Sequence, residues 1–85
     1  TMIKLAELKM QLITEAIKSG CTVFLGSERR KMYHAKPVTH VGFRNTLLGV
    51  VRTRVEVTFE NGKTRVFKLP SFLEVPISIV CGHVE

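Results

Sequence analysis

Five residues of this chain have side chains that could bind a metal ion or act as nucleophiles: Cys21, His34, His40, Cys81 and His83. Structural zinc sites place such ligands in pairs only a few residues apart, and the spacing here fits no such arrangement. A cysteine–histidine pair can be drawn, but no flanking signature of a catalytic dyad accompanies it. We therefore expect no metal ion, no cofactor and no catalytic residues, and we expect that the protein is not an enzyme.

The two cysteines are far apart in the sequence and form no CxxC pair. In a reducing cytoplasm, the default interpretation is that Cys21 and Cys81 are small, buried apolar side chains. A disulfide between them is the alternative, and the sequence alone leaves it open because it gives no geometry.

Cations beside aromatic residues offer the chain's best candidate binding chemistry. Between residues 29 and 68 there are ten basic residues and two acidic ones, whereas the flanking segments are acidic overall. Cations can contact phosphates, and a ring can stack on a base. The alternative is a solvated surface on which Lys63 and Arg65 balance Glu60 and Glu56. The candidate residues for binding nucleic acid or an acidic protein surface are Arg29, Arg30, Lys31, Tyr33, Arg44, Arg52, Arg54, Lys63 and Arg65.

Residues 3–18 have the apolar spacing of a helix and contain neither proline nor glycine. The apolar arc covers more than half of the circumference, so the helix has more apolar surface than one sheet would bury. We expect the surplus to contact a second copy of the chain or a partner. The candidate residues for this self-association or partner face are Ala6, Met10 and Ile13.

The remaining residues predict short strands, and the clearest signal is a hairpin around Asn61-Gly62. Asn-Gly between alternating segments is typical of a two-residue type I′ turn. That turn would place Phe59 opposite Thr64 and Thr58 opposite Arg65, giving one apolar face and one charged face. We expect further strands over residues 21–25, 38–43 and 75–80, with a turn at residues 44–46.

One domain is expected over residues 1–85, with a helix at 3–18 and a β-rich part at 21–84. The fold class is α+β, in which an amphipathic helix packs on a small, mostly antiparallel SH3-like barrel or on a sheet of four to five strands. No segment is long and apolar enough to suggest a membrane span, and no secretory signal is visible, so we expect a cytoplasmic protein.

Residues 38–73 carry a pattern of apolar and glycine positions that resembles a known family. Its parts are Val38, His40 and Phe43, then Gly49–Val51, then Val55, Val57, Phe59, Gly62 and Phe67, with a closing Leu-Pro-x-Phe-Leu at residues 69–73. This pattern resembles small SH3-like barrels of the Tudor/KOW type, in particular the barrel appended to some bacterial DNA helicases. The resemblance implies a binding module that contacts nucleic acid, a polymerase or another protein.

Two functions follow as expectations. The first is a small basic module that binds nucleic acid, with a homodimer as a further possibility. The second is a phage or mobile-element protein that binds and modulates a host protein or nucleoprotein complex through protein–protein contacts. The net charge of +6 argues against an acidic DNA mimic and gives nucleic acid or an acidic protein surface as the partner.

Overall fold

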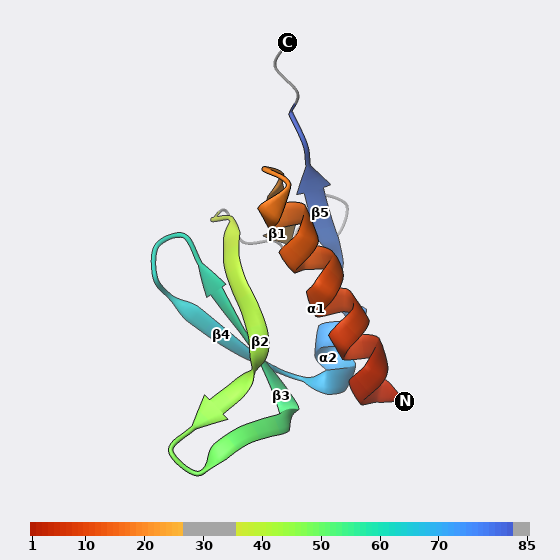
Figure 1. Cartoon of the computed structure of the whole chain (residues 1–85), viewed down its shortest axis with the longest axis vertical. Helices are drawn as coiled ribbons and strands as arrows, with labels where there is room; N and C mark the ends of the chain where they lie inside the picture. Colours follow the sequence, from red (N-terminus) through yellow and green to blue (C-terminus); the bar gives the residue numbers. More distant parts are fainter. Residues whose placement is uncertain (27–35, 83–85) are drawn as a thin grey trace.

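The computed structural model describes residues 1–26 and 36–82, and it confirms the α+β class. In chain order, the elements are α1 (Met2–Lys18), β1 (Thr22–Leu25), β2 (Val38–Thr46), β3 (Gly49–Phe59), β4 (Thr64–Lys68), α2 (Leu69–Glu74) and β5 (Ile77–Val80). Two antiparallel sheets form, with strand orders β1-β5 and β2-β3-β4, and they do not close into a barrel (Figure 1).

Helix α1 begins one residue earlier than predicted, because the Thr1 hydroxyl accepts a hydrogen bond from the Lys4 amide at 3.1 Å. Its buried residues are Ala6, Met10 and Ile13. The prediction that these three form a self-association or partner face is therefore wrong, since the chain's own core covers them. The apolar residues that α1 leaves exposed are Met2, Leu5, Leu8 and Leu12.

The β3–β4 hairpin forms as expected, but its register differs by one residue from the prediction. Thr58 pairs with Thr64, and Val57 pairs with Arg65. The loop contains three residues, because the Phe59 amide donates a hydrogen bond to the Lys63 carbonyl at 2.9 Å, and Gly62 supplies a positive φ of 83°. A type I turn followed by a left-handed glycine explains this loop.

The β2–β3 hairpin extends well past the core. The predicted turn at residues 44–46 is wrong: β2 continues to Thr46, which pairs with Gly49, and the chain reverses at Leu47 and Leu48. The ladder is irregular between Phe43 and Arg44, which pair with Val55 and Val51 respectively. None of residues 44–53 is buried, and we call this segment the arm. Figure 1 shows it projecting away from both helices.

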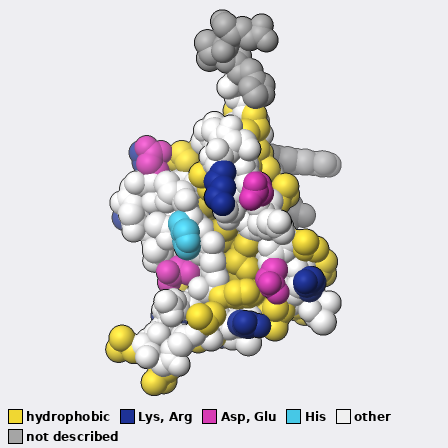
Figure 2. All heavy atoms as spheres, viewed as in Figure 1, with side chains coloured by type: hydrophobic (Ala, Val, Ile, Leu, Met, Phe, Trp, Pro, Cys, Tyr) yellow, Lys and Arg dark blue, Asp and Glu magenta, His cyan; other side chains and the backbone are white. Residues whose placement is uncertain are grey.

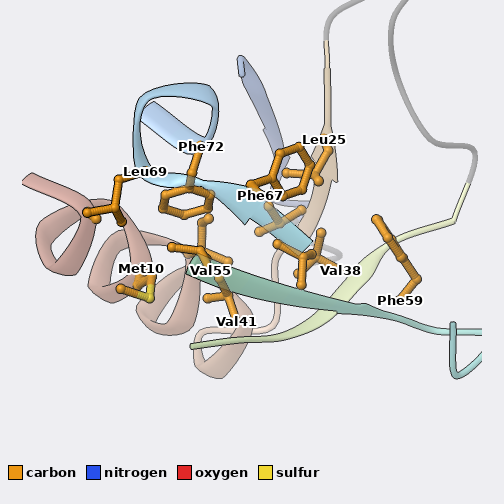
Figure 3. Packing of buried hydrophobic residues seen from close by; sticks show 13 residues of the cluster. Met10, Leu25, Val38, Val41, Val55, Phe59, Phe67, Leu69 and Phe72 are labelled. Atoms are coloured by element: carbon orange, nitrogen blue, oxygen red, sulfur yellow. The ribbon is translucent and has the colours of Figure 1, made fainter. Parts of the chain in front are cut away.

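One hydrophobic core joins both helices to the sheets. Figure 3 shows the side chains converging between the elements. The ring centres of Phe67 and Phe72 are 6.4 Å apart. The central β3 supplies Val55 and Val57, both with no exposed surface. The other members are Ala6, Met10, Ile13, Val23, Leu25, Val38, Val41, Phe59, Phe67, Leu69 and Phe72.

Lys9 joins the two helices. Its ammonium donates hydrogen bonds to the carbonyl oxygens of Phe72 and Val75 at 2.6 and 2.5 Å, and it lies 5.1 Å from the centre of the Phe72 ring. These carbonyls lie near the C-terminal end of α2, where a cation is favourable. Burial lowers the pKa of Lys9 below its usual 10.5.

Cys21 and Cys81 form a disulfide, which corrects the default interpretation of two separate buried thiols. The register explains the bond: Thr22 pairs with Val80, so the residue before β1 lies opposite the residue after β5. The Cα atoms are 4.3 Å apart. Cys81 is exposed and Cys21 is half-buried.

In the described parts of the chain, the helices are too short and too polar to cross a bilayer.

Candidate nucleic-acid interface

The three-stranded sheet and its loops carry all of the predicted basic candidates that the structure describes. Residues 36–68 contain seven basic and two acidic residues, giving a net charge of +5. Four of the nine predicted binding residues, Arg29, Arg30, Lys31 and Tyr33, lie outside the described residues. The sheet and its loops carry the other five, which are Arg44, Arg52, Arg54, Lys63 and Arg65.

Two cations face each other on the side of the sheet that points away from the core. Arg54 of β3 pairs with Lys68 of β4, and strand alternation places both opposite to the buried Val55 and Phe67. Arg54 is half-buried, and its Nη1 donates to the Thr53 carbonyl at 3.2 Å. Lys68 is exposed. Like charges directly opposite each other repel, so this pair creates a positive site that an anion would stabilise.

Lys68 was missing from the residues predicted from sequence. The two-residue turn expected at Asn61-Gly62 would place Lys68 opposite Val55, on the core side. The three-residue loop shifts β4 by one position and brings Lys68 opposite Arg54 instead. Asn-Gly occurs in both kinds of loop, so the sequence contained no signal that separates them.

Arg65 does not join this pair. It lies opposite Val57, on the face that carries Phe67, and its Cζ atom is 4.8 Å from the centre of the Phe67 ring. The expectation that Arg65 lies on a charged face opposite Thr58 is therefore wrong. The guanidinium instead covers the edge of the core by a cation–π contact.

The outward face also carries polar residues that could meet a polyanion. His40 pairs with Thr58, which in turn pairs with Thr64. Glu56 lies between the Thr58 and Arg54 positions on this face, so it partly offsets the positive charge. The resulting surface is basic at the Arg54–Lys68 end and polar at the His40 end.

Arg44 and Arg52 lie in the arm, away from the Arg54–Lys68 pair. Arg44 of β2 pairs with Val51 of β3, and Arg52 follows Val51 at the point where the β2–β3 ladder becomes irregular, so each strand of the arm carries one of these cations. Two leucines at its tip, Leu47 and Leu48, are fully exposed. Neither leucine was singled out from sequence, because exposure of a turn can be read only from the structure.

The cysteines and histidines do not gather into a site within the described residues. Over residues 1–26 and 36–82, no group of three or more His, Cys, Asp or Glu side chains is placed to hold a metal ion. Because Cys21 and Cys81 are joined, neither offers a free thiolate to a metal or a substrate.

Comparison with protein-family models, curated proteins and solved structures gave no match. The resemblance of residues 38–73 to Tudor/KOW-type barrels therefore stays a prediction.

Proposed function

We propose that this protein is a small, non-enzymatic module that binds nucleic acid through the outward face of its three-stranded sheet. The observation that carries the proposal is the cross-strand pair of cations, Arg54 and Lys68. Antiparallel partners hold their Cβ atoms about 5 Å apart, so the two charges repel unless an anion lies between or above them. A phosphate backbone supplies such anions in a row.

The test is fluorescence anisotropy with labelled single- and double-stranded DNA and RNA over a salt series. Arg54→Glu with Lys68→Glu should weaken binding by about tenfold or more. It should also reduce the salt slope, which is the fall in the logarithm of the binding constant with the logarithm of the salt concentration, by about 0.9 for each duplex phosphate that the variant no longer neutralises. The control is Lys4→Glu with Lys18→Glu on α1, which changes the net charge equally. Equal weakening in both variants would mean that net charge alone attracts the nucleic acid, and the proposed interface would be wrong.

A second candidate function, a protein-interaction factor, is favoured by the apolar residues that α1 exposes. Leu5, Leu8 and Leu12 are each more than half exposed and are spaced along one stripe of the helix. Leu8→Glu should abolish self-association measured by light scattering after size exclusion, whereas Gln11→Glu adds the same charge beside the stripe and should not. A monomer at all concentrations would remove self-association from this candidate.

A cytoplasmic location is part of the proposal, and the disulfide provides its test. Cytosolic thiols are kept reduced, whereas disulfides persist in oxidising compartments. In a cytoplasmic protein the Cys21–Cys81 bond of the structure would be open, so protein alkylated directly in lysing cells and analysed by mass spectrometry should carry a label on both cysteines. An unlabelled, joined pair would place the protein in an oxidising compartment.

A further inference from the structure

The tip of the arm presents apolar side chains that the described parts of the chain leave uncovered. Leu47 and Leu48 are 106% and 100% exposed, and Val50 is 60% exposed. Figure 2 shows hydrophobic side chains at the end of the arm, at the lower left of the view. Burying one leucine side chain contributes about 1.5–3 kcal/mol of favourable free energy. Two leucines that stay in water could therefore contribute this free energy to binding a partner.

The tip is held in one shape by its own hydrogen bonds. The Thr46 hydroxyl accepts from the Leu48 amide at 3.2 Å and donates to the Gly49 carbonyl at 2.9 Å. Gly49 has a φ of 119°, which a residue with a side chain rarely adopts. The two leucines therefore project from a turn whose backbone is already ordered, so burying them costs mainly the rotamer freedom of their side chains.

Cations follow this apolar tip on both strands of the arm. Arg44 lies on β2 and Arg52 on β3, and Arg54 follows at the base of the arm. No acidic residue occurs between positions 29 and 55 of the sequence. The arm thus combines a narrow apolar end with positive charge on either side of it.

We propose that the arm is a wedge for double-stranded DNA, and this inference rests on the proposed nucleic-acid-binding function. Leu47 and Leu48 enter between two stacked base pairs, while Arg44 and Arg52 contact phosphates of the two strands. Proteins that kink DNA insert leucine and similar apolar side chains between base steps in this manner. Pyrimidine–purine steps unstack most easily, so a TA step is the expected position.

The size of the tip favours DNA over a lipid bilayer. Two leucine side chains contain fewer carbon atoms than one myristoyl chain, which alone gives only marginal membrane binding. Asn45, Thr46 and Thr53 interrupt the apolar surface of the arm, so beyond the two leucines only Val50 adds a large exposed apolar side chain there. A DNA wedge needs only one or two apolar side chains, because phosphate contacts supply most of the affinity.

The experiment uses the full chain and a duplex with 2-aminopurine beside a central TA step and a fluorophore pair at its ends. The wild type should raise the 2-aminopurine fluorescence and the energy transfer, because an unstacked step fluoresces and a bent duplex brings its ends together. Leu47→Ser with Leu48→Ser should abolish both signals and weaken binding roughly tenfold, while the salt slope stays unchanged. Leu47→Met with Leu48→Met should give both signals as the wild type does, because methionine is also an apolar side chain that can enter between base pairs.

Each contrary outcome identifies what fails. Salt-dependent binding of the wild type without distortion, or equal distortion by the serine variant, would overturn the wedge and leave the proposed function intact. Absence of salt-dependent binding to any nucleic acid would overturn the proposed function and the wedge together. Co-sedimentation with anionic phosphatidylserine vesicles that the serine variant loses, without DNA distortion, would show that the tip contacts a membrane instead.

Discussion

Arg54 and Lys68 occupy directly opposed positions on the outward face of the three-stranded sheet. Their repulsion opposes folding, whereas an anion bound beside them would benefit from both charges. A pair that is unfavourable for stability and favourable for binding is the pattern expected of a functional site. Reversing the charge of one member should therefore move stability and binding in opposite directions.

Lys68→Glu should raise the free energy of unfolding slightly and weaken nucleic-acid binding. Replacing a like-charge pair by an opposite-charge pair across two strands should contribute about 0.5 kcal/mol. Urea denaturation and anisotropy on the same sample measure both effects. Lys63→Glu, which precedes β4 at the end far from Arg54, is the control for the stability effect, and it should not add stability through Arg54. A less stable Lys68→Glu protein would contradict the paired arrangement.

Lys9→Met should lower the free energy of unfolding by about 1–2 kcal/mol, because the carbonyl oxygens of Phe72 and Val75 lose a charged donor. Lys4→Met, at an exposed position on the same helix, should change it little. Denaturant unfolding measures both variants. Equal stability of Lys9→Met and wild type would show that the packing of the side chain's stem outweighs its hydrogen bonds.

The lowered pKa of Lys9 also predicts a dependence on pH. The unfolded chain holds this proton more tightly than the folded chain, so the stability of wild type relative to Lys9→Met should rise as the pH climbs toward 10.5. Above that value the difference should become constant. A relative stability that falls over the same range would mean that the pKa of Lys9 is raised.

Reduction of the Cys21–Cys81 bond should lower the free energy of unfolding by about 2–4 kcal/mol, because the bond closes a long loop in the unfolded chain. Thermal unfolding with and without dithiothreitol measures the effect. The Cys21→Ser, Cys81→Ser double variant should match the reduced protein and ignore the reductant. A wild type that reacts with two equivalents of thiol reagent while folded would show that the bond is absent.

Adjacent residues of α1 should respond very differently to truncation. Ile13→Ala should cost about 2–5 kcal/mol, because Ile13 has no exposed surface and the change leaves a cavity. Leu12→Ala should change stability by less than about 0.5 kcal/mol, because that side chain is 55% exposed. Similar effects at both positions would mean that the helix is rotated about its axis relative to the core.

The elements were largely predictable from sequence, because helical and alternating apolar periods dominate α1 and β3. The buried side of α1 was not predictable, because apolar residues cover more than half of the helix circumference. Periodicity alone cannot tell whether the stripe of leucines or the stripe with Ala6, Met10 and Ile13 faces the core. The structure buries Ala6, Met10 and Ile13 and exposes the leucines. The small Ala6 side chain allows the helix to approach the core closely, which is a tertiary effect that no single-sequence pattern contains.

The candidate site was less predictable than the fold. Arg54 was identified from charge alone, but its partner Lys68 depended on a loop that is one residue longer than the simplest Asn-Gly turn. A one-residue slip moves every side chain of a strand to the other face, so an error in the loop became an error in the site. Arg65 changed faces for the same reason.

The Cys21–Cys81 bond also determines how this protein would respond to a pulling force. Tension applied at the two ends of the chain would first peel away α1, which precedes Cys21, and would then pass directly through the sulfur atoms to Cys81. The strands and α2, all between the two cysteines, would bear no load. A protein-unfolding machine whose pore admits one extended polypeptide segment would therefore meet a covalently closed loop between residues 21 and 81 that it cannot pull straight.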